Sequence, residues 1–234
     1  MKKALILGCS HAAGAEMAHE PGVVYRDAIE FEEYGYTRSY PVLIAQALGY
    51  QALNHAIPGG SNDAMFRIFE SSNLPSNDIV IACWTGFDRS EVWYEKERRW
   101  LALAHSGINV HQKQSSTIVL EGLNSGAIIK ESAQYSEYAK HWAINEGNIF
   151  RGRLNKLKNI FALNALAQTR GTKVINIHSF NAVECGSFEW PIGLEDFCNW
   201  CKHRDFAHTD GGHYFKDAHA QFAEHLLDFC SGIV

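Results

Sequence analysis

Short apolar runs that stop at turn residues alternate along this chain with longer segments of helical periodicity. Apolar runs of about four to eight residues, bounded by turn residues, are typical of strands buried on both faces of a parallel sheet. Runs of this kind occupy residues 4–7, 50–57, 78–84 and 172–178. We therefore expect these segments to form neighbouring strands of one sheet.

The segments between these runs predict helices. Pro41 suits the first turn of a helix and Gly49 suits its end, so one helix is expected between them. Ser61 or Asn62 can cap the next, because a side-chain oxygen there accepts from the first free N–H groups. Two further helices are predicted from apolar spacing, at residues 150–170 and 215–229.

Alternating strands and helices indicate an α/β protein, here a three-layer α/β/α sandwich with a central parallel sheet of flavodoxin-like type. We expect a single domain over residues 1–234. Residues 12–39 lack firm periodicity and are predicted to be a long loop. Residues 93–147 are predicted to be an insertion, with a helix-like piece at residues 100–104.

Composition excludes several classes of protein. The chain has 234 residues, a net charge of −5 and 46% hydrophobic residues, with no clustered basic face for nucleic acid or an anionic membrane. No apolar stretch approaches the ~20 residues of a transmembrane helix. The N-terminal apolar run is shorter than the ~7–15 residues of the apolar h-region of a signal peptide. We expect a cytoplasmic protein; its oligomeric state does not follow from the sequence.

Six scattered cysteines indicate a reducing compartment rather than a disulfide framework. Cys198 and Cys201, followed by His203 and His208, have the residue types of a zinc site. A single Cys-x-x-Cys without a second pair is weak support for such a site. We therefore predict no metal and no cofactor, with zinc binding through Cys198 and Cys201 as a third reading.

Ser10 follows the first predicted strand, and open α/β sheets bind ligands beyond the carboxyl ends of their strands. A serine hydroxyl at neutral pH needs a base, an orienter for that base, and donors for an oxyanion. Asp210-Gly211-Gly212-His213 offers His213 as the base and Asp210 as the group that orients it. A Ser10–His213–Asp210 catalytic triad is the resulting hypothesis.

Three groups are candidate oxyanion donors. The N–H of Ser10 lies at the start of a predicted helical turn, and Gly59 can present an N–H that no side chain obstructs. Thr85 follows the third strand and comes to the same edge. Other motifs are absent from the sequence: there is no Gly-x-Ser-x-Gly, no Gly-x-Gly-x-x-Gly after the first strand and no Walker A loop.

Three blocks of this sequence resemble the SGNH, or GDSL-type, serine hydrolases. The first appears as Gly8-Cys9-Ser10, with Cys9 where that family usually has Asp. The second runs from Asn54 to Gly59, and the last is Asp210-Gly211-Gly212-His213 before a C-terminal helix. Three further features together look like a divergent branch common in bacteriophage genomes: Ser-Tyr-Pro at the start of the first helix, the Pro-Gly-Gly-Ser-Asn stretch, and Trp84-Thr85 followed by Arg89.

This resemblance implies an esterase or O-deacetylase that acts on a small-molecule or glycan ester, often an acylated sugar. The third block of the family, Gly-x-Asn-Asp, is replaced by Trp84-Thr85-Gly86-Phe87-Asp88, which lacks the Asn oxyanion donor. The Thr85 hydroxyl, or secondarily Arg89, can substitute for it. A catalytically silent SGNH-like binding or phage structural module is the alternative.

Overall fold

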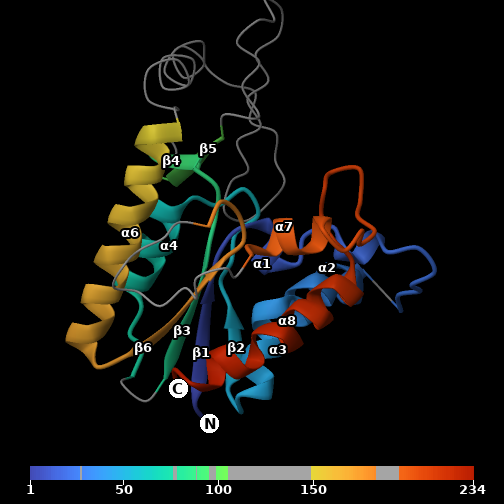
Figure 1. Cartoon of the computed structure of the whole chain (residues 1–234), viewed down its shortest axis with the longest axis horizontal. Helices are drawn as coiled ribbons and strands as arrows, with labels where there is room; N and C mark the ends of the chain where they lie inside the picture. Colours follow the sequence, from blue (N-terminus) through green and yellow to red (C-terminus); the bar gives the residue numbers. More distant parts are fainter. Residues whose placement is uncertain (27, 76–77, 88, 95–98, 105–148, 183–194) are drawn as a thin grey trace, which may run out of the picture.

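A four-stranded parallel sheet forms the centre of the protein, as the computed structural model shows (Figure 1). The structure describes residues 1–26, 28–75, 78–87, 89–94, 99–104, 149–182 and 195–234. The strands are β1 (Lys3–Leu7), β2 (Gln51–Asn54), β3 (Ile79–Trp84) and β6 (Lys173–His178), in the order β2-β1-β3-β6. All three strand pairs are parallel, so the prediction of an α/β fold with a parallel sheet is confirmed.

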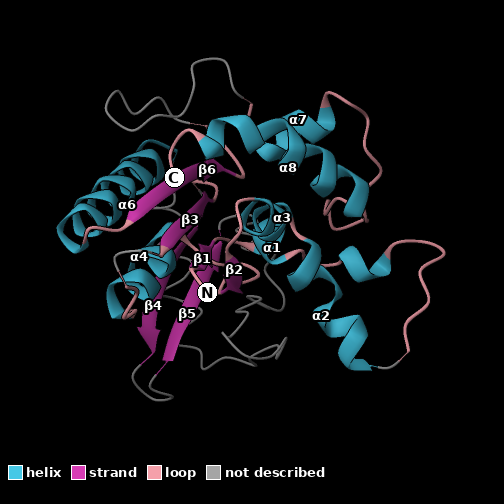
Figure 2. Ribbon diagram, turned by 90° about the horizontal axis from the view of Figure 1, so that it is seen from below, coloured by secondary structure: helices cyan, strands magenta, loops and turns pink. Residues whose placement is uncertain are grey.

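Helices cover both faces of this sheet (Figures 1 and 2). α3 (Tyr40–Ala47), α7 (Phe197–Lys202) and α8 (Lys216–Ser231) pack on one face, and α4 (Asn62–Ser71) and α6 (Ile149–Arg170) pack on the other. Alternate residues of each strand point to opposite faces, so Ile6 joins one core and Leu7 the other. Two buried layers explain why β3, which is buried at every position, is apolar throughout.

The predicted helices are present and begin where the sequence signals place them. Pro41 lies in the first turn of α3, and Ser61 Oγ accepts a hydrogen bond from Ala64 N at 3.1 Å at the start of α4. α6 ends at Arg170, immediately before Gly171. Within the described ranges, no helix has both the length and the apolar character needed to cross a membrane.

The prediction of a long loop over residues 12–39 is wrong. The segment contains α1 (Ser10–Ala13), a 3-10 helix η1 (Met17–His19) and α2 (Ala28–Arg38). α2 leaves Ile29 exposed, so its apolar residues do not show a clean helical stripe. Its packing depends instead on a close backbone approach: a Cβ added to Gly35 would lie 1.9 Å from the carbonyl oxygen of Gly14.

The insertion begins with an antiparallel hairpin of β4 (Arg89–Tyr94) and β5 (Arg99–Ala104). The predicted helix-like piece at residues 100–104 is therefore a strand, in which Trp100 faces Trp93 across the pair. Cross-strand aromatic pairs of this kind favour a hairpin over local helix propensity. The rest of the predicted insertion, residues 105–148, lies outside the described residues.

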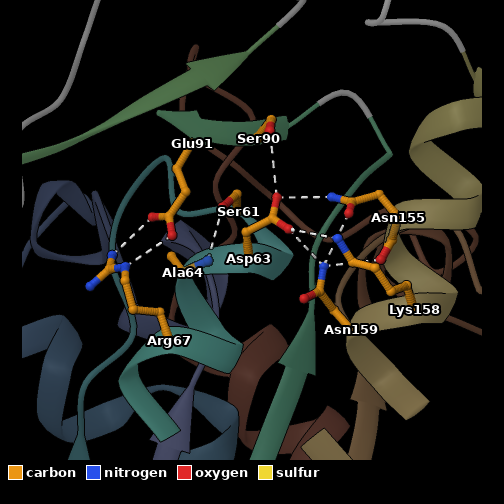
Figure 3. A network of polar contacts seen from close by, with 9 residues as sticks. All are labelled: Ser61, Asp63, Ala64, Arg67, Ser90, Glu91, Asn155, Lys158 and Asn159. Carbon is orange, nitrogen blue, oxygen red and sulfur yellow. Dashed lines mark hydrogen bonds and ion pairs between the residues drawn. The ribbon is translucent and has the colours of Figure 1, made fainter. Parts of the chain in front are cut away.

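A polar network joins α4 to the hairpin and to α6 (Figure 3). Asp63 accepts hydrogen bonds from the Nδ2 atoms of Asn155, at 2.8 Å, and Asn159, at 2.9 Å. Arg67 donates two hydrogen bonds of 2.9 Å to the Glu91 carboxylate. These contacts fix β4 and α6 against the start of α4 and partner the charged groups involved.

Candidate functional site

The carboxyl ends of all four parallel strands meet at one edge of the sheet. β1 has β2 on one side and β3 on the other. The chain therefore runs from β1 to one side of the sheet and from β3 to the other side, so the strand order reverses between β1 and β3. In open α/β sheets, the crevice beyond such a switch point is the usual ligand site. The segment that leaves β1 there is Gly8-Cys9-Ser10.

Ser10 is the first residue of α1 and lies at this switch point. Its side chain is largely enclosed, with the residue 5% exposed. Among the described residues, no group makes a hydrogen bond with Ser10 Oγ. The Ser10 hydroxyl is therefore not engaged by another group of the described part of the chain.

His213 reaches the same place from the other end of the chain. It closes a turn in which Thr209 N donates to His213 O at 2.9 Å and His213 N donates to Thr209 Oγ1 at 3.2 Å. The His213 ring lies against α1, with its centroid 4.9 Å from that of His11, the neighbour of Ser10. The fold thus brings His213 beside the helix that begins at Ser10.

The carboxylate that faces His213 comes from Glu16, not from Asp210. His213 Nδ1 lies 3.1 Å from Glu16 Oε2, an ion-pair distance whose angle falls outside that of a hydrogen bond. Asp210 is exposed on the turn and makes no hydrogen bond or ion pair within the described part of the chain. The structure does not bring Asp210 to His213.

Glu16 is the residue that sequence reasoning missed. It lies between α1 and η1 with a φ of 60°, a left-handed conformation that no local motif signals. The Thr209 hydroxyl donates a hydrogen bond to Glu16 Oε2. This bond, opposed by partial burial and aided by nearby His213, lowers the pKa of the Glu16 carboxyl below its ordinary value.

Aromatic rings surround His11 on the inner side of the site. Phe180 lies 4.8 Å and Phe197 5.4 Å from the His11 ring, centroid to centroid. Burial lowers the pKa of His11 well below its usual range, and nearby His213 adds to the effect. His11 is therefore neutral near neutral pH.

Cys198 Sγ lies 3.3 Å from His11 Nε2, so Cys198 is an alternative nucleophile to consider. The thiolate is the reactive form of cysteine. Burial raises the pKa of the Cys198 thiol and so disfavours its thiolate. Cys198 therefore lacks the lowered pKa that a cysteine nucleophile requires. A serine hydroxyl does not need to ionise beforehand, because a neutral histidine takes its proton during the attack.

The loop after β2 lies against the loop after β1. Ile57 N donates to the carbonyl oxygen of Gly8 at 2.9 Å, which places the Gly59 turn next to the segment leading into Ser10. Within the described ranges, the Gly59 N–H has no backbone partner. Gly59 therefore stays a candidate oxyanion donor.

Thr85 is predicted to be an oxyanion donor, which has to reach the substrate. It is fully buried, and its N–H donates to Asn62 Oδ1 at 3.0 Å. Its hydroxyl is buried without a hydrogen bond to any described residue. Thr85 can therefore serve as an oxyanion donor only through that hydroxyl.

Arg89, the other candidate for the missing donor, stands at the start of β4. Its guanidinium carbon lies 5.5 Å from the Phe180 ring centroid, and its buried Nη1 makes no hydrogen bond to the described residues. α6 anchors the Phe180 loop, because Lys156 Nζ donates to the Phe180 carbonyl oxygen at 2.6 Å. Arg89 thus lies near the aromatic wall of the site.

The cysteines and histidines of the zinc reading do not converge. Cys201 is buried in the core, and His203 pairs with the carboxylate of Glu195. In the described ranges, no group of three or more histidine, cysteine or acidic side chains is arranged to hold a metal ion.

The chain matches no protein-family model, and it matches no curated protein. Among solved structures, it is similar to an acetyl xylan esterase (Est2A) from the rumen bacterium Butyrivibrio proteoclasticus. The TM-score is 0.43 and the sequence identity 10%, over 99% of this chain and 64% of that chain. A likeness at this level does not establish a family, so any function has to rest on the site itself.

Proposed function

We propose that this protein hydrolyses carboxylic esters through an acyl-enzyme formed on Ser10. The observation that carries the proposal is the position of His213. Its ring lies against α1, 4.9 Å from the ring of the residue that follows Ser10. Its Nδ1 faces a carboxylate, which leaves Nε2 as the nitrogen available to a hydroxyl.

The reaction proceeds in two halves. His213 Nε2 takes the proton of Ser10 as Oγ bonds to the ester carbonyl carbon, and the C=O electron pair moves onto oxygen. The N–H groups of Ser10 and Gly59 stabilise this oxyanion, with the Thr85 hydroxyl as a third donor. The tetrahedral intermediate then expels the alcohol, which takes the proton back from His213.

A water molecule completes the cycle. His213 accepts a proton from the water as its oxygen bonds to the acyl carbon, and the Ser10–acyl bond breaks with return of a proton to Ser10. The products are an alcohol and a carboxylic acid, and neither half needs a metal or an organic cofactor. The resemblance to SGNH hydrolases supports an O-acetyl ester of a sugar as the substrate class.

A catalytically silent module is the second candidate, and one observation favours it. The Thr85 N–H and the Asn62 side-chain oxygen bond to each other, and Asn62 Nδ2 donates to the Gly86 carbonyl oxygen at 3.3 Å. The Thr85 N–H is therefore not free to bind the oxyanion of a substrate. Loss of one oxyanion donor lowers the rate by about 10²–10³-fold in a serine protease.

Turnover of p-nitrophenyl acetate and of acetylated xylan by the wild type and by Ser10→Ala separates the two candidates. The enzyme reading predicts hydrolysis by the wild type and a loss of at least ~10³-fold in kcat in the variant. Because Ser10 Oγ has no partner among the described residues, Ser10→Ala should fold with near wild-type stability. Equal inactivity of both folded proteins on both substrates refutes the enzyme reading.

A further inference from the structure

We propose that Glu16 is the carboxylate that positions His213 for catalysis. This inference rests on the proposed function and assigns to Glu16 the role that the sequence suggested for Asp210. The third member of the triad would then come from the segment six residues after the nucleophile rather than from the turn that carries the base.

The geometry supports Glu16 through two contacts on one oxygen. Oε2 lies 3.1 Å from His213 Nδ1 and also accepts a hydrogen bond from the Thr209 hydroxyl. Thr209 Oγ1 in turn accepts from the backbone N–H of His213 at 3.2 Å. Glu16, Thr209 and His213 therefore form a closed set in which the carboxylate is held toward the ring.

Gly211 makes room for this carboxylate. A Cβ added there would lie 2.6 Å from Oε2 and 2.8 Å from Oε1 of Glu16. Cβ atoms essentially never approach another heavy atom this closely, so a side chain at position 211 would shift the Glu16 carboxylate. The Asp-Gly-Gly-His turn is thus shaped to receive a carboxylate from outside it.

Asp210 lacks every one of these contacts. It is exposed, and it has no ion pair or hydrogen bond with a described residue. The Glu16 side chain is 39% exposed and that of His213 is 18% exposed, so the pair lies at the border between the site and solvent. Solvent screening makes the attraction modest, and the main contribution of Glu16 is to fix the ring and its tautomer.

Two other histidines, His11 and His219, lie near His213. Burial lowers the pKa of His11 well below its usual range and that of His219 to about 3. Both are therefore neutral near neutral pH and add no charge beside His213 there. His19 is a further titratable neighbour of Glu16.

The test compares four variants of the full chain: Glu16→Gln, Glu16→Asp, Asp210→Asn and Glu224→Gln. Glu224 is an exposed residue of α8 and serves as the matched control. We measure kcat and KM for p-nitrophenyl acetate against pH. In parallel, the titration of the His213 ring proton is followed by NMR, a reading that does not depend on turnover.

We expect Glu16→Gln to lower kcat by roughly 10²-fold while KM changes by less than about threefold, because a wrongly held tautomer affects the transition state. Glu16→Asp should regain part of this loss, and Asp210→Asn should lose less than Glu16→Gln. His213 is one of the groups that lower the pKa of Glu16, so the two side chains interact electrostatically. The midpoint measured for the His213 ring should therefore fall in Glu16→Gln, because the imidazolium loses its negative neighbour. The acid limb of activity should move the same way.

Two results would overturn the assignment. One is a larger loss of kcat in Asp210→Asn than in Glu16→Gln. The other is a His213 midpoint that shifts in Asp210→Asn but stays at the wild-type value in Glu16→Gln. If the wild type shows no turnover, the proposed function fails, and the NMR midpoints alone still decide which carboxylate pairs with His213.

Discussion

Two polar regions of this molecule differ in how completely their groups are partnered. The network between α4, β4 and α6 satisfies both oxygens of Asp63 and both oxygens of Glu91 (Figure 3). At the carboxyl edge of the sheet, side-chain atoms of several buried residues lack a hydrogen bond to any described residue. They are His11 Nδ1, Thr85 Oγ1 and Arg89 Nη1.

This difference indicates that the network stabilises the fold and that the sheet edge is the candidate region for binding a ligand. Leaving a buried polar group unpaired costs about 1–3 kcal/mol. Such groups persist where something other than stability maintains them, and functional sites are where this is expected. We therefore expect substitutions in the two regions to have different effects. Substitutions at the sheet edge should lower activity, and substitutions in the network should lower stability.

The largest effect is expected at His213. His213→Gln removes the proposed base and should lower kcat for p-nitrophenyl acetate by at least ~10³-fold. Its free energy of unfolding should change by no more than about 1 kcal/mol, because the side chain is partly exposed. Steady-state kinetics and urea denaturation measure the two effects.

His219 is the matched control for this comparison. It is fully buried, and its Nδ1 accepts a hydrogen bond from Tyr40 N at 3.1 Å. His219→Ala should cost roughly 2–4 kcal/mol of stability through lost packing and an unpaired N–H. If His213→Gln proved the more destabilising of the two and kept its activity, the separation between the regions would not hold.

A smaller effect is expected in the network. Asp63→Ala leaves the amides of Asn155 and Asn159 without their acceptor and should cost about 1–3 kcal/mol. The melting temperature should fall by several degrees, while kcat per folded molecule stays within about twofold of the wild type. Differential scanning calorimetry together with the ester assay measures both quantities.

Asp217→Ala provides the control for Asp63. Asp217 also lies in the first turn of a helix, and within the described ranges it makes no comparable network. Loss of its interaction with the helix dipole alone should cost less than about 1 kcal/mol. Equal losses in the two variants would show that the Asp63 network adds nothing beyond a charge at a helix start.

The sheet and its principal helices follow from the sequence because their signals are local. Apolar runs mark the strands, and Pro41, Gly49 and Ser61 mark helix ends through backbone geometry and capping. α2 could not be predicted in this way because it has no apolar stripe. A tertiary contact, the close approach of Gly35 to Gly14, holds it in place instead. The hairpin likewise depends on pairing between Trp93 and Trp100, which helical spacing conceals.

The site is predictable in part for the same reason. Ser10 and His213 stand at ends of regular elements, so the topology carries both to one edge. Glu16 lies in an irregular turn whose path no spacing rule predicts, and its partner Thr209 is nearly two hundred residues away. Asp210 fits the sequence pattern, yet the turn presents it to solvent.

The most direct test of the account is covalent labelling of the folded protein by a fluorophosphonate, followed by mass spectrometry to locate the adduct. Such reagents react with a serine hydroxyl that a neighbouring base activates. We predict one adduct per chain on Ser10, lost in Ser10→Ala and strongly slowed in His213→Gln. An adduct on any other residue, or no adduct on the folded wild type, would contradict the claim that Ser10 is an activated nucleophile.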